Sequence, residues 1–530
     1  MSRAQKSNRT EQIEIERKYD VDEAARVPDL GGVGRIVSCA AVEPVALRAV
    51  YYDTAEQVLL ANRITLRRRE GGHDEGWHVK LPGGAGARRE VHAPLGADPD
   101  EPLPASLRRV IEVVLRGRPV RPVLILETSR AVTLLRDGDG ADLAELADDR
   151  VTATAPGAAG TRGAAGTRGA AGARTPGAGM SRSWREWEVE LAPGSSRQDG
   201  EKLLDQVGAR LLDAGATPSP SKSKLARGLG DALPPAPLLA DYQPETRSAA
   251  AFVLGALGRV VDELKAADAG VRDGDAEAVH EFRMSIRRLR SILRVYRGVV
   301  DKQTSASVCS ALARVGRAAG STRDLQVAGD ELGLDLDAAP DGYVSQETVG
   351  RLRAGLTEAS REAERDLERD LADASYFELL DRLDVVLASE PTGPAAEHRA
   401  TKFASSRLAK ETERARRKTE IASAAYRETG DCERALIHAA RKAARRLRYA
   451  IEAQQSAELH GAESAEVAHE LQDVLGEALD AGSAAERFVA AAYTARWAGE
   501  DTFGYGVLAT LAAGRRSAAL ARLPILAGKL

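Results

Sequence analysis

The segment EIERKYD, residues 14–20, has the alternating pattern of a β-strand with one charged face. Successive side chains of a strand point to opposite faces, so Glu14, Glu16 and Lys18 share one surface. Carboxylates along one face repel each other, and burying them without counter-ions costs several kcal/mol each. For one isolated strand, a solvated sheet face is the usual explanation. The segment becomes informative together with the strands that share its pattern.

Three further segments show the same alternation: RITLRRRE at 63–70, GWHVKLP at 76–82 and WREWEVEL at 184–191. They place Arg67 beside Arg69 on one face, and Glu188 beside Glu190 on another. A divalent cation between the glutamates and a phosphate chain against the arginines would neutralise both sets. The pattern therefore predicts an N-terminal β-domain with a charged binding face.

Length and composition exclude several classes of protein. At roughly 150 residues per domain, 530 residues make two to four domains. Cys39, Cys309 and Cys432 form no CxxC pair, which argues against a zinc site or a disulfide framework. A net charge of −4 and 4% aromatic residues disfavour nucleic-acid binding by base stacking. The sequence has no signal-peptide pattern and no apolar run of about 18 residues, so we expect a cytoplasmic protein that spans no membrane.

Changes in composition along the chain mark the domains. Alternating segments occupy residues 12–230, and the Pro-rich stretch over 231–246 is predicted to be a linker. Residues 247–525 are rich in Ala, Leu, Arg and Glu with helical periodicity, which predicts an all-helical domain. Within the first domain, repeats of GAAGTR predict a disordered insertion over 155–180. We therefore expect an α+β protein.

The order of motifs in the first domain resembles the CYTH domain of the triphosphate tunnel metalloenzyme superfamily. ExExK is followed by YYDT, RxR, WxxK, RxE and finally ExE. The resemblance implies an eight-stranded antiparallel barrel whose inward side chains form a tunnel. It also implies Mg²⁺ or Mn²⁺ as the cofactor and inorganic triphosphate as the substrate. Hydrolysis of a phosphoanhydride relies mainly on positioning and charge neutralisation, which such a tunnel can supply.

The same resemblance implies a role for each matching residue. Catalysis is expected of Glu14, Glu16 and Lys18. Substrate binding is expected of Arg48, Arg67, Arg69, Lys80, Arg130 and Lys222. Metal binding is expected of Glu14, Glu16, Glu90, Glu145, Asp149, Glu188 and Glu190. Asp148 is an alternative to its neighbour Asp149.

The helical half contains an internal repeat. HEFRMSIRRLR at 280–290 and HAARKAARRLR at 438–448 share the pattern HxxRxxxRRLR at an offset of 158 residues. The repeat predicts two related helical bundles packed as a pseudo-symmetric pair. On a helix, the histidine and the spaced arginines of each copy form one basic stripe. Each stripe lies opposite an apolar face, which would anchor the helix in a core.

Acidic partners are nearly missing from both stripes. A basic stripe is normally a solvated helix face, but stacked like charges disfavour a helix unless an anion neutralises them. Arginine predominates, as expected for bidentate contact with phosphate oxygens. A metal-binding role for the two histidines is a rival interpretation.

The stripes and an STRDLQV motif resemble the CHAD domain, a family of two four-helix bundles associated with inorganic polyphosphate. The resemblance covers residues 247–525 and implies polyphosphate binding by a set of basic residues. These are His280, Arg283, Arg287, Arg288, Arg290, Arg323, His438, Arg441, Arg445, Arg446 and Arg448.

These features predict a metal-dependent inorganic triphosphatase with a polyphosphate-binding second domain. The expected partners are triphosphate and polyphosphate, and polyphosphate binding would allow association with polyphosphate granules. The alternative is a non-catalytic polyphosphate-binding scaffold. Adenylate cyclase activity is a third hypothesis, which only the shared tunnel motif favours.

Overall fold

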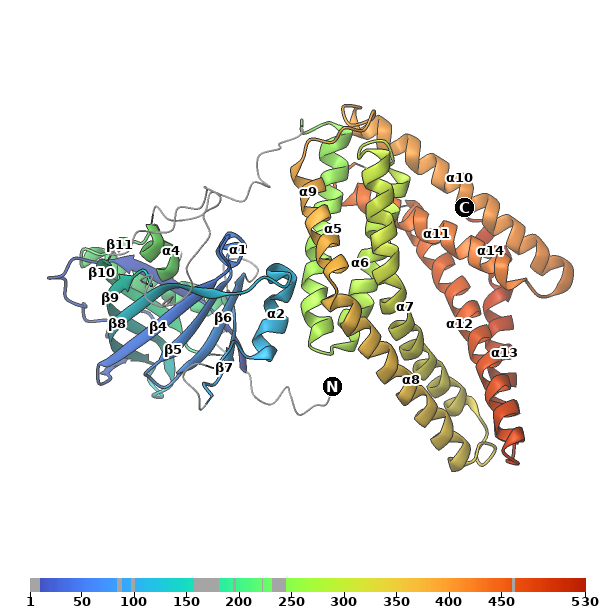
Figure 1. Ribbon diagram of the computed structural model, residues 1–530, viewed down its shortest axis with the longest axis horizontal. Coiled ribbons are helices and arrows are strands. Elements are labelled where there is room, and N and C mark those ends of the chain that lie inside the picture. Colours follow the sequence, from blue (N-terminus) through green and yellow to red (C-terminus); the bar gives the residue numbers. More distant parts are fainter. Residues whose placement is uncertain are drawn as a thin grey trace, which may run out of the picture. The chain divides into compact units, whose positions relative to one another are not determined.

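The computed structural model describes residues 10–82, 88–96, 101–156, 181–193, 197–221, 223–230, 245–459 and 463–530. The chain divides into two compact units, Met1–Pro237 and Leu238–Leu530. The first holds a large antiparallel sheet, and the described elements of the second are all helices (Figure 1). This confirms the predicted α+β class. The insertion predicted over 155–180 and the linker predicted over 231–246 lie largely outside the described residues.

The sheet of the first unit has eleven strands among the residues that the structure describes. They are β1 (Thr10–Glu14), β2 (Glu16–Asp20), β3 (Ser38–Ala41), β4 (Val45–Asp53), β5 (Thr65–Glu70), β6 (Gly76–Pro82), β7 (Arg88–Ala93), β8 (Arg121–Arg136), β9 (Asp142–Thr154), β10 (Ser181–Leu191) and β11 (Thr217–Pro218). The four segments with alternating charge lie largely on these strands, with Arg63, Ile64 and Ile15 outside them, because one face of each strand is apolar and packs against a helix or core.

The order of the strands brings both ends of the sheet to the N-terminal segment. Strands pair in the order β1-β7-β6-β5-β4-β8-β9-β10-β2-β11, with β3 beside β8. Only Ile15 separates β1 from β2, yet β1 pairs with β7 and β2 pairs with β10. The sheet is therefore not closed, and it has more strands than the eight predicted. The reason is that the chain changes its pairing partner at Ile15, while the short strands β3 and β11 extend the edges.

Helices cover the apolar outer face of the sheet and one part of its inner face. Residues of α2 (Ala105–Leu115) pack on Val79 and Val91, and residues of α3 (Arg197–Asp213) pack on Trp187. The short α4 (Lys224–Leu229) packs instead against Leu126, which lines the cavity inside the sheet. It begins at Ser223, whose hydroxyl accepts the amide N–H of Ala226. The rest of the inner face, which carries the charged side chains, is not covered by these helices and can form a site. The remaining short helix of this unit is α1 (Val58–Ala61).

The second unit contains ten helices among its described residues. They are α5 (Ala249–Arg272), α6 (Ala276–Val295), α7 (Lys302–Ala338), α8 (Gln346–Ala372), α9 (Ala374–Ala388), α10 (Ala400–Thr429), α11 (Arg434–Gln455), α12 (Glu463–Trp497), α13 (Phe503–Ala521) and α14 (Leu523–Ala527). Among the described residues, none of the helices is long and apolar enough to cross a bilayer.

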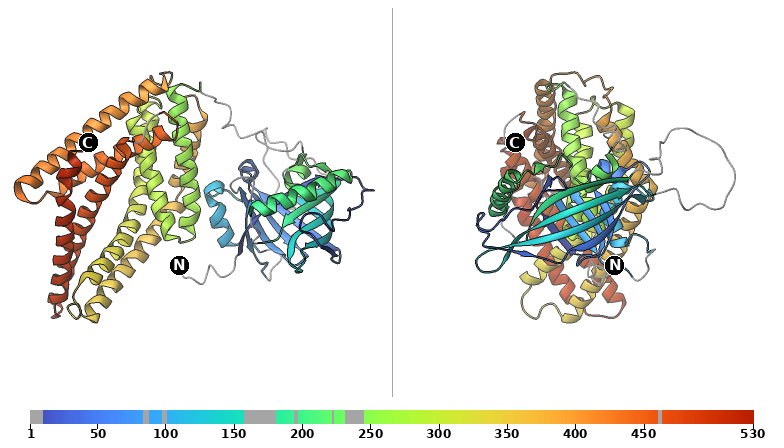
Figure 2. Two further views of the ribbon diagram at one scale, coloured as in Figure 1. Left: turned by 180° about the vertical axis from the view of Figure 1, so that it is seen from behind. Right: turned by 90° about the vertical axis from the view of Figure 1, so that its left-hand side faces the viewer.

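The helices form two groups with the same internal order, α5–α9 and α10–α14, each with four longer helices and a shorter last one. Figure 2 shows the first group in green to tan and the second in orange to red. The amide of Ala249 donates to the carbonyl of His398, and the amide of Ala400 donates to the carbonyl of Arg247. This reciprocal pair relates α5 to α10. The repeated motifs lie on α6 and α11, which pack against each other, as expected for a pseudo-symmetric pair.

Candidate functional site

The inner face of the sheet surrounds a cavity of about 820 Å³ in the first unit. Every strand from β4 to β10, together with β1, β2 and α4, contributes to its wall. The charged side chains of the wall are Glu14, Glu16, Lys18, Glu43, Arg67, Arg69, Asp74, Lys80, Arg88, Glu90, Arg130, Asp142, Glu145, Glu188, Glu190 and Lys224. Strand alternation thus gathers most of the predicted site residues in one enclosed space.

A row of three carboxylates crosses adjacent strands of this cavity. Glu190 of β10 pairs in register with Glu16 of β2 on one side and with Glu145 of β9 on the other. Burial and the charges of Glu16 and Glu145 raise the pKa of Glu190 to about 7. Burial and a hydrogen bond with Glu90 raise the pKa of nearby Glu14 to about 8. Glu14 and Glu190 therefore have too little positive charge nearby.

Apart from Lys18, whose Nζ lies 3.0 Å from Glu16 Oε2 and whose charge lowers the pKa of Glu16 despite burial, Lys80 is the cation beside these carboxylates. Its Nζ lies 2.5 Å from Glu14 Oε2 and 3.8 Å from Glu90 Oε1. Its charge lowers the pKa of Glu14 and of Glu190, but burial outweighs this effect in both cases. Two ammonium groups are too few to neutralise Glu14 together with the row, because the pKa values of Glu14 and Glu190 remain raised.

Basic side chains gather on the strands opposite. Arg67 Nη2 lies 3.3 Å from Glu90 Oε1, and Arg69 pairs with Asp74. Burial and the neighbouring charges of Arg67 and Arg130 lower the pKa of Arg69 to about 9. The Nε atoms of Arg67 and Arg69 are buried without a hydrogen-bond partner among the described residues. A bound anion would satisfy these donors and relieve the repulsion.

A second group of carboxylates lies deeper and is already neutralised. Asp149, Glu186 and Glu188 are buried and offer ligand atoms within 4.8 Å of one another, so they could hold a metal ion. Arg130 makes two hydrogen bonds to Asp149, of 2.8 Å and 2.6 Å. Lys224 Nζ lies 2.5–3.0 Å from oxygens of all three carboxylates. A metal ion would have to displace these cations.

The chemistry of the donor set therefore favours the other group for a divalent cation. The pKa values of Glu14 and Glu190 are raised, Glu16 and Glu145 lie in register beside Glu190, and Lys18 and Lys80 are the cations that contact this group. Oxygen ligands of this kind suit Mg²⁺ or Mn²⁺. The residues present thus fit the metal that the sequence predicts.

Three predicted residues of the sheet domain need comment. Arg48 faces away from the cavity, which corrects its predicted role: its neighbours Leu47 and Ala49 line the cavity, and Arg48 pairs with Glu70 on the exposed side. Side chains alternate between the two faces along β4, and the position of Arg48 belongs to the outward-facing set. Asp149 lies inside, whereas Asp148 pairs with Arg185.

The third residue, Lys222, lies outside the described residues. Lys224, two positions later in the same SKSK segment, is the lysine found in the cavity. Burial lowers the pKa of Lys224, but attraction by Glu188 and Asp149 raises it above its usual value.

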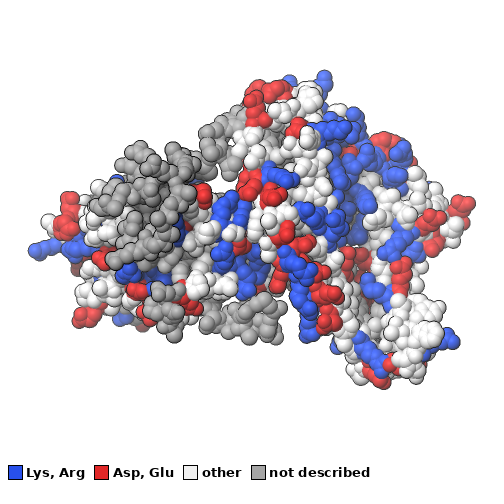
Figure 3. Space-filling model, viewed as in Figure 1, with Lys and Arg blue, Asp and Glu red and all other residues white. Residues whose placement is uncertain are grey.

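The helical unit contains a basic groove of about 1150 Å³ between its two groups of helices. Arg283, Arg287 and Arg290 of α6 face His438, Arg441 and Arg445 of α11 across it. Figure 3 shows Lys and Arg side chains, in blue, on the face of this unit that is turned to the viewer. Both predicted stripes therefore line one shared space, which we call the groove.

The groove has too few carboxylates to neutralise its arginines. Arg283 Nη1 lies 2.9 Å from Asp324, and Arg441 Nη1 lies 3.8 Å from Asp480, a pair in the equivalent place. Burial and the charges of Arg283 and Arg445 lower the pKa of Arg287 to about 9. Stacked guanidinium groups of this kind favour an anionic ligand.

The histidines of the motifs add hydrogen bonding rather than charge at neutral pH. Burial and the charge of Arg323 lower the pKa of His280, and burial and Lys442 lower that of His438. His438 lines the groove, whereas His280 and Arg323 lie outside its lining. No carboxylate cluster among the described residues includes either histidine.

Three predicted arginines lie away from the groove, which corrects their assignment. Arg288 pairs with Glu263 and Glu452 on an outer face, and Arg446 pairs with Glu411. Arg448 pairs with Glu452 and lies over the ring of Tyr449. Arg288 and Arg446 lie one position off their stripes and therefore face away, and Arg448 lies one turn beyond Arg445, the last residue of α11 that lines the groove.

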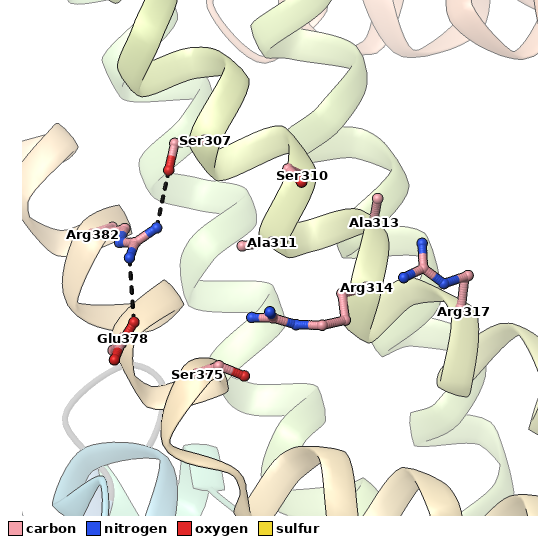
Figure 4. A pocket seen from close by; sticks show the side chains of 9 residues that line it. All are labelled: Ser307, Ser310, Ala311, Ala313, Arg314, Arg317, Ser375, Glu378 and Arg382. Atoms are coloured by element: carbon pink, nitrogen blue, oxygen red, sulfur yellow. Dashed lines mark hydrogen bonds and ion pairs between the residues drawn. The ribbon is translucent and has the colours of Figure 1, made fainter.

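A smaller cavity of about 510 Å³ lies between α7 and α9 (Figure 4). In it Arg314 extends from α7, whereas Arg382 donates to the hydroxyl of Ser307 and pairs with Glu378. Arg317 lines both this cavity and the groove. The basic surface therefore continues over α7 beyond the groove itself.

Comparisons with known proteins assign both units. The CYTH domain family model matches residues 12–210, and the CHAD domain family model matches residues 255–489. An uncharacterised protein of Mycobacterium tuberculosis is 36% identical over 498 residues, which covers 94% of this chain and 92% of that protein.

The chain belongs to the family with a CYTH domain followed by a CHAD domain.

Solved structures with similar folds include PptA from Streptomyces chartreusis, which is 18% identical, with a TM-score of 0.41. That match covers 53% of this chain and 99% of the other. The CHAD domain of the plant Ricinus communis is 19% identical, with a TM-score of 0.43, and the match covers 55% of this chain and 96% of the other.

Sequence reasoning missed several residues of both domains. In the CYTH domain, Tyr51, Arg88 and Lys224 line the cavity. YYDT and RxE carried a signal for the first two, whereas nothing in SKSK distinguishes one lysine from the other. In the CHAD domain, Arg317 and Arg487 come from α7 and α12, helices on which no stripe was visible.

Proposed function

We propose that the CYTH domain hydrolyses inorganic triphosphate with the help of a divalent metal ion. The observation that carries the proposal is that one cavity contains both carboxylates with too few cations and buried arginine N–H donors without an anion. A metal–triphosphate complex supplies both counter-charges at once.

The residues of the cavity would have three roles: metal binding, phosphate binding and the positioning of carboxylates. Glu14, Glu16, Glu145 and Glu190 would hold Mg²⁺ or Mn²⁺, which neutralises phosphate charge and orients a water molecule when bound. Arg67, Arg69 and Arg130 would bind the non-bridging oxygens and keep the reacting phosphate in place. Lys18 stays paired with Glu16 and Glu188, and so positions both carboxylates.

The experiment is phosphate release from tripolyphosphate by the purified full chain, with Mg²⁺, with Mn²⁺ and with a chelator. We expect release only with metal. ATP and long polyphosphate, assayed in parallel, rank the substrates, and cyclic AMP formation tests the cyclase hypothesis. Absence of release with either metal between about pH 7 and pH 9 would leave the scaffold hypothesis instead.

We further propose that the CHAD domain binds inorganic polyphosphate in the groove. Support comes from the two arginine stripes that share this space with only partial neutralisation by Asp324 and Asp480. Nucleic acid fits less well, because no Phe, Tyr or Trp side chain of the described residues lines the groove for base stacking. Binding of labelled polyphosphate to the full chain, titrated with salt, tests this second function.

A further inference from the structure

A second basic cavity adjoins the groove of the CHAD domain. Its volume is about 880 Å³, and it lies between the end of α6, the start of α7 and the middle of α10. Ala313 of α7 lines both the groove and this second cavity. The exposed and half-buried cations of its wall are Arg294, Arg297, Lys302, Arg407, Lys410, Arg414 and Arg446.

Carboxylates of the chain neutralise little of this charge. Glu411 is the one acidic residue of the wall, and it lies 2.9 Å from Arg446 and 3.7 Å from Arg414. Arg294 and Arg297 have no ion pair with a carboxylate among the described residues. Burial and the charge of Arg297 lower the pKa of Arg407. The second cavity thus carries a surplus of positive charge.

The other half of the domain lacks this surplus at the equivalent place. The offset of 158 residues between the two motifs relates Arg446 to Arg288 and Arg294 to Glu452. The reciprocal bonds at the starts of α5 and α10 relate Ala400 to Ala249, and therefore Arg414 to Glu263.

Arg288 is neutralised by these same glutamates, at 2.9 Å from Glu263 and 3.3 Å from Glu452. In the second cavity both positions carry arginine instead, next to Arg446. If the surplus of positive charge were a by-product of the internal repeat, it would be present in both halves. The asymmetry therefore indicates a site specific to one half.

We propose that the second cavity binds phosphate groups of a polyphosphate chain that already occupies the groove, and so makes the CHAD domain prefer long chains to short ones. This rests on the polyphosphate binding proposed above. The shared wall at Ala313 allows one flexible polyanion to enter both spaces. RNA is the less suitable ligand, because no aromatic residue of the described part of the chain lines the second cavity.

The test exchanges the two arginines for the glutamates of the other half, as Arg294→Glu with Arg414→Glu in the full chain. Both side chains are exposed, so the fold should tolerate the change. Binding is measured for polyphosphate of about 100 units and for tripolyphosphate, with single-stranded RNA as competitor. We expect affinity for the long chain to fall at least about tenfold with a reduced salt slope, and affinity for tripolyphosphate to stay within about twofold.

The matched control is Arg417→Glu with Arg427→Glu, which makes the same charge change on α10 outside the cavities described here. The proposal is overturned if the control weakens long-chain binding equally, if the cavity variant leaves it unchanged, or if RNA displaces polyphosphate at equal phosphate concentration. Loss of all binding on replacing Arg283, Arg287, Arg441 and Arg445 identifies the groove separately. Long-chain binding that survives this groove variant contradicts the proposed function of the groove.

Discussion

Glu190 of β10 lies directly opposite Glu16 of β2, so two carboxylates face each other across adjacent strands inside the CYTH domain. Like charges in this position destabilise a sheet unless a cation lies between them. The pair also lines, half-buried, a cavity that carries arginine Nε donors without a partner among the described residues. We infer a site in which a metal ion neutralises the carboxylates and a phosphate chain binds the arginine donors.

Removing one of these carboxylates should reduce turnover more than substrate binding. We expect Glu14→Gln, Glu16→Gln and Glu190→Gln each to lower kcat for tripolyphosphate by about 100-fold, because the charge that develops in transfer loses stabilisation. KM should change by less than about threefold, since the arginines still bind the substrate. Steady-state phosphate release with saturating Mn²⁺ measures both. Kinetics like those of the unaltered protein for all three variants would remove the assignment of the cavity.

Arginine substitutions should separate the two faces of the sheet. Arg67→Ala should raise KM for tripolyphosphate by about tenfold, because it removes a charge-assisted contact worth roughly 1.5–3 kcal/mol. Arg48→Ala is the matched control, since its side chain is exposed and pairs with Glu70 outside the cavity. A larger effect of the control than of Arg67→Ala would mean that the inward and outward positions are assigned the wrong way round.

Metal binding should strengthen as the pH rises. In the metal-free protein the pKa is about 8 for Glu14 and about 7 for Glu190, so a metal ion has to displace protons below these values. Apparent Mn²⁺ affinity, measured by calorimetry, should rise more than about tenfold from pH 6 to pH 7 and only about twofold from pH 8 to pH 9.

The same shifts predict the stability of the metal-free CYTH domain. Its two raised pKa values mean that the folded state binds more protons than the unfolded state, so its stability should fall as the pH rises from about 5 to about 8. Added Mn²⁺ should reverse this loss, as seen by thermal unfolding. A metal-induced rise in Tm that is greater at pH 6 than at pH 8 would contradict the prediction.

Lys224 should be essential to the fold of the cavity. Replacing it with methionine leaves Asp149, Glu186 and Glu188 with too little positive charge, and breaking a buried pair of this kind costs about 3–5 kcal/mol. Chemical denaturation of the Lys224→Met variant measures the loss. Lys222→Met is the comparison that the sequence itself suggests, and an equal loss in that variant would return the role to Lys222.

In the CHAD domain, the arginine stripes should act together. Replacing Arg283 and Arg287 with alanine, or Arg441 and Arg445, should each weaken polyphosphate binding, and replacing all four should abolish it. Affinity should fall steeply with salt, since each phosphate that is bound releases a counter-ion. A quadruple variant that remains helical by circular dichroism and binds with unchanged affinity would show that the stripes are solvated surfaces.

Much of the molecule follows from periodicity alone. Alternation in EIERKYD and WREWEVEL places Glu16, Lys18, Glu188 and Glu190 on one face, because a strand has a fixed period of two. The spacing in HxxRxxxRRLR places Arg283 and Arg287 on one side of α6, because a helix has a fixed period of 3.6. The α+β class and the order of the two domains follow from the same local signals.

Register, rotation and long-range neutralisation were decided only by the tertiary structure. Pairing between β10 and β2 aligns Glu190 with Glu16, although 174 residues separate them in sequence. Equally local patterns left Arg48 outside the cavity and turned Arg288 toward Glu263. A residue's type and spacing determine which face it shares with its neighbours. The partners that neutralise its charge come from distant segments, and only packing brings these segments together or leaves the charge without a partner.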